Sequence, residues 1–80
     1  MDQFKQIKPI TDLTAEEAIA LLKQPPEQLV KTAYTRDGLI IRLVVLCHAA
    51  GSTKAKNFLE FLLREGSDED KKLVEAVYAP

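Results

Sequence analysis

The sequence predicts an all-α protein, a small compact bundle of about five short helices around a central apolar helix at residues 39–50. Three observations support this class. Helix-capping signals recur along the chain, several segments repeat apolar residues at helical spacing, and no segment shows the alternation of a half-buried strand. The chain has 80 residues, which suits one small domain. We therefore expect a single helical domain over residues 1–80, with residues 1–12 as an N-terminal arm.

The first helix is predicted at residues 15–24. Thr14 is followed three residues later by Glu17, which is the signature of a capping box at a helix start. Apolar residues then recur on one face until Pro25, which cannot continue a helix.

A second short helix is expected to begin at Pro26, because proline suits the first helical position. Its expected apolar face comprises Leu29, Val30, Ala33 and Tyr34. We interpret the following Asp37-Gly38 pair as a turn, or as a glycine-terminated helix end, that leads into the central helix.

The run GLIIRLVVLCHAAG, at residues 38–51, contains ten apolar side chains and one arginine. Its β-branched residues favour a strand as readily as a buried helix. We prefer a helix over residues 39–50, because a lone strand would leave its backbone groups without partners. The run is too short for a transmembrane helix, which needs about 20 apolar residues, so we expect no membrane association.

Two amphipathic helices are predicted to complete the fold. The first spans residues 53–65, with Ser52 or Thr53 as its N-cap and Gly66 just beyond its end. Ser67 caps the last helix, whose first turn carries Asp68-Glu69-Asp70. We expect these three carboxylates to be there for their favourable interaction with the helix dipole, and the main alternative is a solvated acidic patch for a basic partner.

The residue pattern points away from catalysis. Cys47 and His48 are the only soft ligands, and as neighbours on a helix they point about 100° apart, so they do not chelate one metal ion. No set of acid, base and nucleophile can be assembled. We expect no enzyme activity, no catalytic residue, no cofactor and no metal. A single cysteine and an N-terminus without an apolar signal segment favour the cytoplasm.

The function that these features favour is protein binding. The chain is rich in apolar residues for its size, and a basic middle segment precedes an acidic one although the net charge is only −1. We expect a small non-enzymatic module that occupies a partner's surface, as adaptors, inhibitors, immunity proteins and antitoxins do. The partner is expected to be another protein or a second copy of the chain, giving a homodimer.

A nucleic-acid-binding protein of helix-turn-helix type is the weaker alternative. It would use the helix 53–65, which carries Lys54 and Lys56 near its start, where a recognition helix reads bases. Against it, Glu60 and Glu65 further along this helix would repel phosphate.

Phe61 is the predicted anchor of the partner-binding surface. Counting about 100° per residue, it falls roughly 120° from the inward side of the helix 53–65. An exposed aromatic among charged residues is typical of interface hot spots, although isolated exposed apolar side chains are also common. The predicted partner-binding residues are Lys54, Lys56, Phe61, Arg64 and Arg42.

Arg42 belongs to this set because it lies inside the apolar central helix. Its guanidinium must reach solvent, meet a carboxylate, or cross an interface. The carboxylates that could meet it within the chain are Glu16, Glu17 and Glu27.

Overall fold

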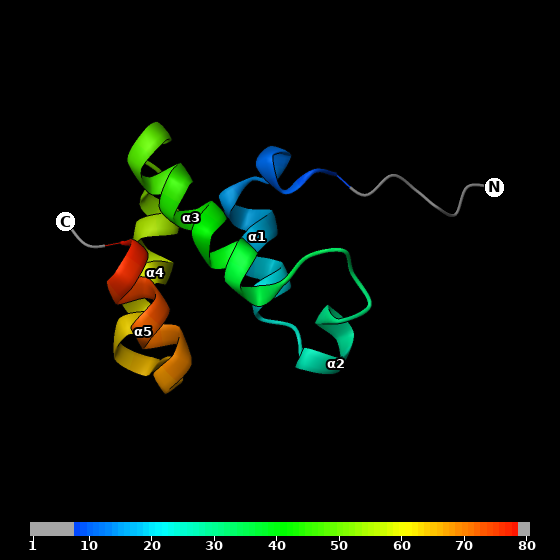
Figure 1. Ribbon diagram of the computed structural model, residues 1–80. Coiled ribbons are helices and arrows are strands. Elements are labelled where there is room, and N and C mark those ends of the chain that lie inside the picture. Colours follow the sequence, from blue (N-terminus) through cyan, green and yellow to red (C-terminus); the bar gives the residue numbers. More distant parts are fainter. Residues whose placement is uncertain (1–7, 79–80) are drawn as a thin grey trace.

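The computed structural model describes residues 8–78, which contain five α-helices, one 3-10 helix and no strand (Figure 1). The predicted all-α class is therefore confirmed. The elements, in chain order, are η1 (Ile10–Asp12), α1 (Ala15–Leu22), α2 (Pro26–Leu29), α3 (Arg36–Ala50), α4 (Thr53–Glu65) and α5 (Asp68–Val77).

Helix α3 is the centre of the arrangement. It packs most extensively against α1 and α4, and it also contacts α5 and η1. In Figure 1, α1 lies on one side of α3 and the α4–α5 pair lies on the other, while α2 stands apart from α4 and α5. Because α1 also contacts α4, helices α1, α3 and α4 enclose a common core.

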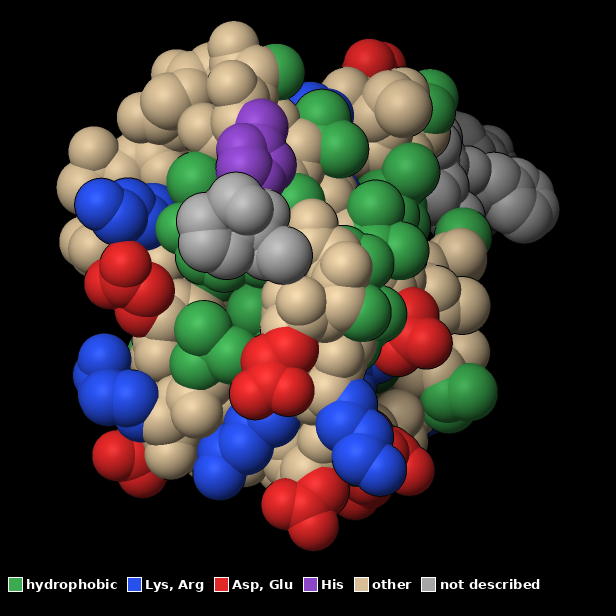
Figure 2. Space-filling view, turned by 60° about the vertical axis from the view of Figure 1, so that its left-hand side comes forward, with side chains coloured by type: hydrophobic (Ala, Val, Ile, Leu, Met, Phe, Trp, Pro, Cys, Tyr) green, Lys and Arg blue, Asp and Glu red, His purple; other side chains and the backbone are tan. Residues whose placement is uncertain are grey.

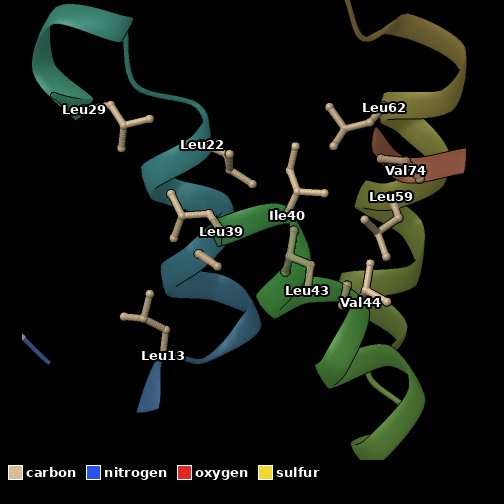
Figure 3. Packing of buried hydrophobic residues seen from close by; sticks show 12 residues of the cluster. Leu13, Leu22, Leu29, Leu39, Ile40, Leu43, Val44, Leu59, Leu62 and Val74 are labelled. Atoms are coloured by element: carbon tan, nitrogen blue, oxygen red, sulfur yellow. The ribbon is translucent and has the colours of Figure 1, made fainter. Parts of the chain in front are cut away.

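The core is formed almost entirely by aliphatic side chains. The largest fully buried ones are Leu39, Ile40, Leu43, Leu59 and Val74. Figure 3 shows the side chains of α3 meeting those of α1 and α2 on one side and those of α4 and α5 on the other. Each fully buried aliphatic side chain contributes roughly 1.5–3 kcal/mol, so this cluster is the main stabilising feature.

Helix α3 is buried on one side only, although the sequence is apolar around its whole circumference. Leu39, Ile40, Leu43 and Val44 are buried, which is more than any other helix contributes. On the opposite side, Ile41 and Val45 are 43% and 45% exposed. The helix is therefore central, as predicted, but its outer side is not covered by the other helices described.

The predicted capping signals of three helices are confirmed. At α1 the Glu17 amide donates to the Thr14 hydroxyl at 3.1 Å, and the Thr14 amide donates to the Glu17 carboxylate at 2.9 Å. Ser52 rather than Thr53 caps α4, and Ser67 caps α5. The helix predicted at residues 15–24 ends two residues earlier, at Leu22.

The second helix is shorter than predicted. Helix α2 ends at Leu29, and Val30, expected on its apolar face, is 75% exposed. The Thr32 hydroxyl donates to the Leu29 carbonyl and accepts from the Tyr34 amide. Such side-chain hydrogen bonds give the backbone an alternative to the helix, which explains the early end.

The interpretation of Asp37-Gly38 as a turn or helix end is wrong. Both residues lie in the first turn of α3, which begins at Arg36. Thr35 is the N-cap, and its hydroxyl accepts a hydrogen bond from the Gly38 amide at 3.0 Å. A Cβ atom at Gly38 would lie 3.0 Å from the Thr35 hydroxyl and 3.1 Å from Ile10, so the glycine serves close packing here.

Asp70 of α5 cannot belong to a solvated acidic patch, the alternative interpretation of the three acids. Its side chain is only 8% exposed, and both carboxylate oxygens accept hydrogen bonds from Arg36, at 2.9 and 2.7 Å. Arg36 also donates to the Leu22 carbonyl at 3.2 Å. The guanidinium thus joins the start of α3, the start of α5 and the end of α1.

The described part of the N-terminal arm packs against the helices. The Tyr34 hydroxyl donates to the Lys8 carbonyl at 2.6 Å, and the Lys8 ammonium donates to Glu17 at 2.8 Å. Ile10 is partly buried against the core. Residues 1–7 of the predicted arm lie outside the described residues.

Candidate functional site

A hollow of about 460 Å³ lies between α1 and α4. Its apolar lining comes from both helices: Ile19 and Ala20 of α1, and Phe58 and Phe61 of α4. Its polar lining consists of Glu16, Lys23, Lys54 and Asn57. We call the surface formed by these eight residues the Phe61 face.

The Phe61 ring is held in place by a neighbouring ring. Phe58 is partly buried against the core, and its ring centroid lies 5.6 Å from that of Phe61, with the planes inclined by 33°. This separation is typical of favourable aromatic pairs. Phe61 itself remains 42% exposed, so the ring is both fixed and accessible.

An ion pair joins the two helices at this face. The Lys54 ammonium donates a hydrogen bond to the Glu16 carboxylate, and both side chains are well exposed to solvent. Exposed ion pairs contribute about 0–1 kcal/mol, so this contact adds little stability. The hollow therefore has an apolar floor, and its edge carries one positive and one negative side chain from this ion pair.

The structure brings together only part of the predicted set. Lys54 and Phe61 line the same hollow. Arg64 is exposed and follows Phe61 by three residues, about 60° away around α4. Lys56 is exposed but lies about 140° from Phe61 around the same helix, so it belongs to a different side.

Arg42 lies apart from the Phe61 face and has a partner within the chain. Its Nε atom donates to the Leu13 carbonyl oxygen at 3.0 Å, and no ion pair between Arg42 and a carboxylate occurs among residues 8–78. From the sequence, the Arg42 guanidinium was expected to reach solvent, a carboxylate or an interface. Its hydrogen-bond partner is instead a backbone carbonyl of the same chain. Arg42 anchors the segment before α1 to the central helix.

Sequence reasoning missed the contribution of α1 to this face. Ile19 is one of the apolar residues that recur on one face of the first predicted helix, and Lys23 carries no signal of its own. The i, i+3 spacing of Phe58 and Phe61 was the one indication that two rings would lie side by side.

A second hollow, of about 510 Å³, lies between α3, α4 and α5. We call it the C-terminal hollow; it is lined by Cys47, His48, Glu60, Leu63, Val74, Glu75 and Tyr78. Figure 2 shows the face that carries the histidine, with hydrophobic side chains on either side of it and charged side chains gathered lower on the face.

Aromatic and thiol groups meet at one end of the C-terminal hollow. The rings of His48 and Tyr78 lie 5.8 Å apart, inclined by 44°. The Cys47 thiol donates to the Tyr78 hydroxyl at 3.7 Å. The hydrogen-bonded contact between these two acidic groups raises the pKa of Tyr78, and desolvation acts in the same direction.

Within residues 8–78 no group of three or more His, Cys, Asp or Glu side chains is arranged to hold a metal ion. In the same range, no helix has the length and apolar character needed to cross a bilayer. No protein-family model, curated protein or solved structure matches the chain.

Proposed function

We propose that this chain is a small non-enzymatic protein-binding module that acts by occupying a partner's surface through the Phe61 face. The observation that carries the proposal is the Phe61 ring, which is 42% exposed yet stacked on Phe58 beside an apolar hollow. Adaptors, inhibitors, immunity proteins and antitoxins act in this way. The cytoplasm is the compartment we propose.

The Phe61 face has the composition of an interface core with a polar rim. Ile19, Ala20 and Phe58 offer an apolar floor, and burying Phe61 against a partner would remove further apolar surface from water. Glu16 and Lys54 supply charges of both signs at the edge. Aromatic anchors in such a setting often carry much of the binding free energy.

The partner is another protein or a second copy of this chain. In favour of a copy, Phe61 and the hollow lie on the same surface. A two-fold symmetric contact would therefore place the ring of each protomer at the hollow of the other.

Nucleic-acid binding through α4 is the second candidate. It is favoured by the order of α3, a left-handed Gly51 (φ 64°) and α4, with Lys54 and Lys56 in the first turn of α4. The engagement of Lys54 by Glu16 leaves less positive charge for phosphate, so protein binding is the better supported proposal.

The test compares Phe61→Ala with the native chain. Because the ring is half exposed, we expect the melting temperature to change little. Partner binding, or dimerisation measured by sedimentation equilibrium, should weaken by more than about 1 kcal/mol. Proteins captured from the source organism should be lost from the Phe61→Ala bait.

Val30→Ala is the matched control, because Val30 is an exposed apolar residue outside the Phe61 face. It should retain every partner. A loss of about 3–5 kcal/mol of stability in Phe61→Ala would show instead that the ring is part of the core. Salt-dependent binding of duplex DNA that is lost in Lys54→Ala and Lys56→Ala would favour the second candidate.

A further inference from the structure

The C-terminal hollow combines an apolar floor with negative charge. Leu63 is partly buried and offers apolar surface to the hollow, and Val74, which also lines it, is fully buried. Glu60 and Glu75 are the acidic residues among its lining, and no lysine or arginine of residues 8–78 lines it. Neither glutamate forms an ion pair within residues 8–78. These two carboxylates therefore remain available to an external cation.

The shape and chemistry of this hollow match one type of side chain. Lysine and arginine carry a long apolar stem that packs on apolar surface, and a cationic head that stays at a polar edge. The Tyr78 ring adds a face that attracts cations when it is approached within about 6 Å. A hollow of about 510 Å³ has room for such a side chain together with neighbouring atoms of a partner.

We propose that the C-terminal hollow receives a lysine or arginine side chain of a partner protein, with the stem on Leu63 and the head between Glu60 and Glu75. This rests on the proposed function as a protein-binding module, and it assigns a second contact surface distinct from the Phe61 face. The argument is charge complementarity: an acidic edge around an apolar floor selects a basic side chain over a neutral or acidic one.

The test uses detached side chains as probes. Butylamine corresponds to the lysine side chain, propylguanidine to the arginine side chain, and 1-butanol is a neutral chain of similar size. Each is titrated into the ¹⁵N-labelled full chain at pH 8, above the usual titration range of histidine. The amide shifts of Leu63, Glu75 and Tyr78 report on the hollow.

We expect saturable shifts at these amides with both cations, at dissociation constants about fivefold or more below that of 1-butanol. The double variant Glu60→Gln and Glu75→Gln should remove this preference. The matched control, Glu27→Gln with Glu69→Gln, makes the same change in net charge at two exposed residues outside the hollow and should preserve it.

Four results would overturn the proposal. In the first, 1-butanol binds as well as the cations. In the second, the preference for cations over 1-butanol survives in the Glu60 and Glu75 double variant. In the third, no probe shifts the three amides. Concentration-dependent shifts at these amides without a probe would assign the hollow to a second copy and would also overturn it. Phe61→Ala should leave the titrations unchanged, so failure here is distinguishable from failure of the Phe61 face.

Discussion

The Arg36–Asp70 pair is the one contact between oppositely charged side chains, among residues 8–78, in which one partner is nearly buried. The Asp70 side chain is 8% exposed and that of Arg36 is 40% exposed. A buried carboxylate is tolerated only when it is paired and hydrogen-bonded, and Arg36 meets both needs with two donors. The pair therefore fixes how α5 sits against α3.

This pair predicts a specific dependence of stability on pH. The hydrogen bond from Arg36 lowers the pKa of Asp70 in the folded protein, although burial partly opposes it. A carboxyl whose folded pKa is lowered stabilises the fold above its unfolded pKa of about 3.9, and this contribution is lost as pH falls through the folded pKa. The free energy of unfolding should therefore fall on acidification below about pH 5.

Asp70→Asn tests this contribution. We expect it to lower the free energy of unfolding at pH 7 by about 1–3 kcal/mol, a moderate loss because water screens the half-exposed guanidinium. The variant should also show a smaller decrease between about pH 5 and pH 2, measured by urea unfolding. Asp68→Asn, in the exposed first position of α5, should behave like the native chain. Equal acid sensitivity in Asp70→Asn and the native chain would contradict the prediction.

At the scale of single elements, hydroxyl caps set where the helices begin. Thr14, Thr35, Ser52 and Ser67 each accept a hydrogen bond from an amide in the first turn of the helix that follows. A cap satisfies one of the amides that a helix start leaves without a partner. With Thr35 as its cap, the central helix begins at Arg36, three residues before the predicted start at residue 39.

Thr35→Ala should destabilise the protein by about 1 kcal/mol, because the Gly38 amide loses its hydrogen-bond acceptor. Urea unfolding measures this loss. Thr53→Ala is the control, since Thr53 is an exposed first residue of α4 whose cap is Ser52. It should change stability by less than about 0.5 kcal/mol. A similar loss in both variants would mean that the cap of α3 has no special role.

At the scale of the whole molecule, the two sides of α3 have different roles. The side with Leu39, Ile40, Leu43 and Val44 holds α1 against α4 and α5, as Figure 3 shows. The side with Ile41 and Val45 is half exposed. The same substitution at neighbouring residues of α3 should therefore have very different effects on the stability of the fold.

Val44→Asp should unfold the protein or cause aggregation. Val44 is 7% exposed, and an unpaired buried carboxylate costs several kcal/mol against a total stability of about 5 kcal/mol for a small domain. Val45→Asp places the same charge one residue further on, at a half-exposed position, and should retain the helical circular dichroism spectrum and a cooperative melt. A stable, soluble Val44→Asp monomer would show that α3 is not the core helix.

The sequence by itself determined the helix class and most helix starts. The capping box of Thr14 and Glu17 and the caps Ser52 and Ser67 depend on hydrogen bonds between residues three apart, so local sequence suffices to predict them. The exposure of Phe61 was also predictable, because the apolar face of helix 53–65 is sharply defined.

Only the tertiary structure decided which side of α3 is covered, because an all-apolar circumference has no preferred side until its neighbours are placed. The same holds for Asp70, whose partner Arg36 lies 34 residues away in the chain. It also holds for the α1 half of the Phe61 face, where Ile19 and Lys23 line the same hollow as Phe61 only because α1 packs on α4. Contacts between distant residues follow from how the helices pack, and local sequence patterns do not encode them.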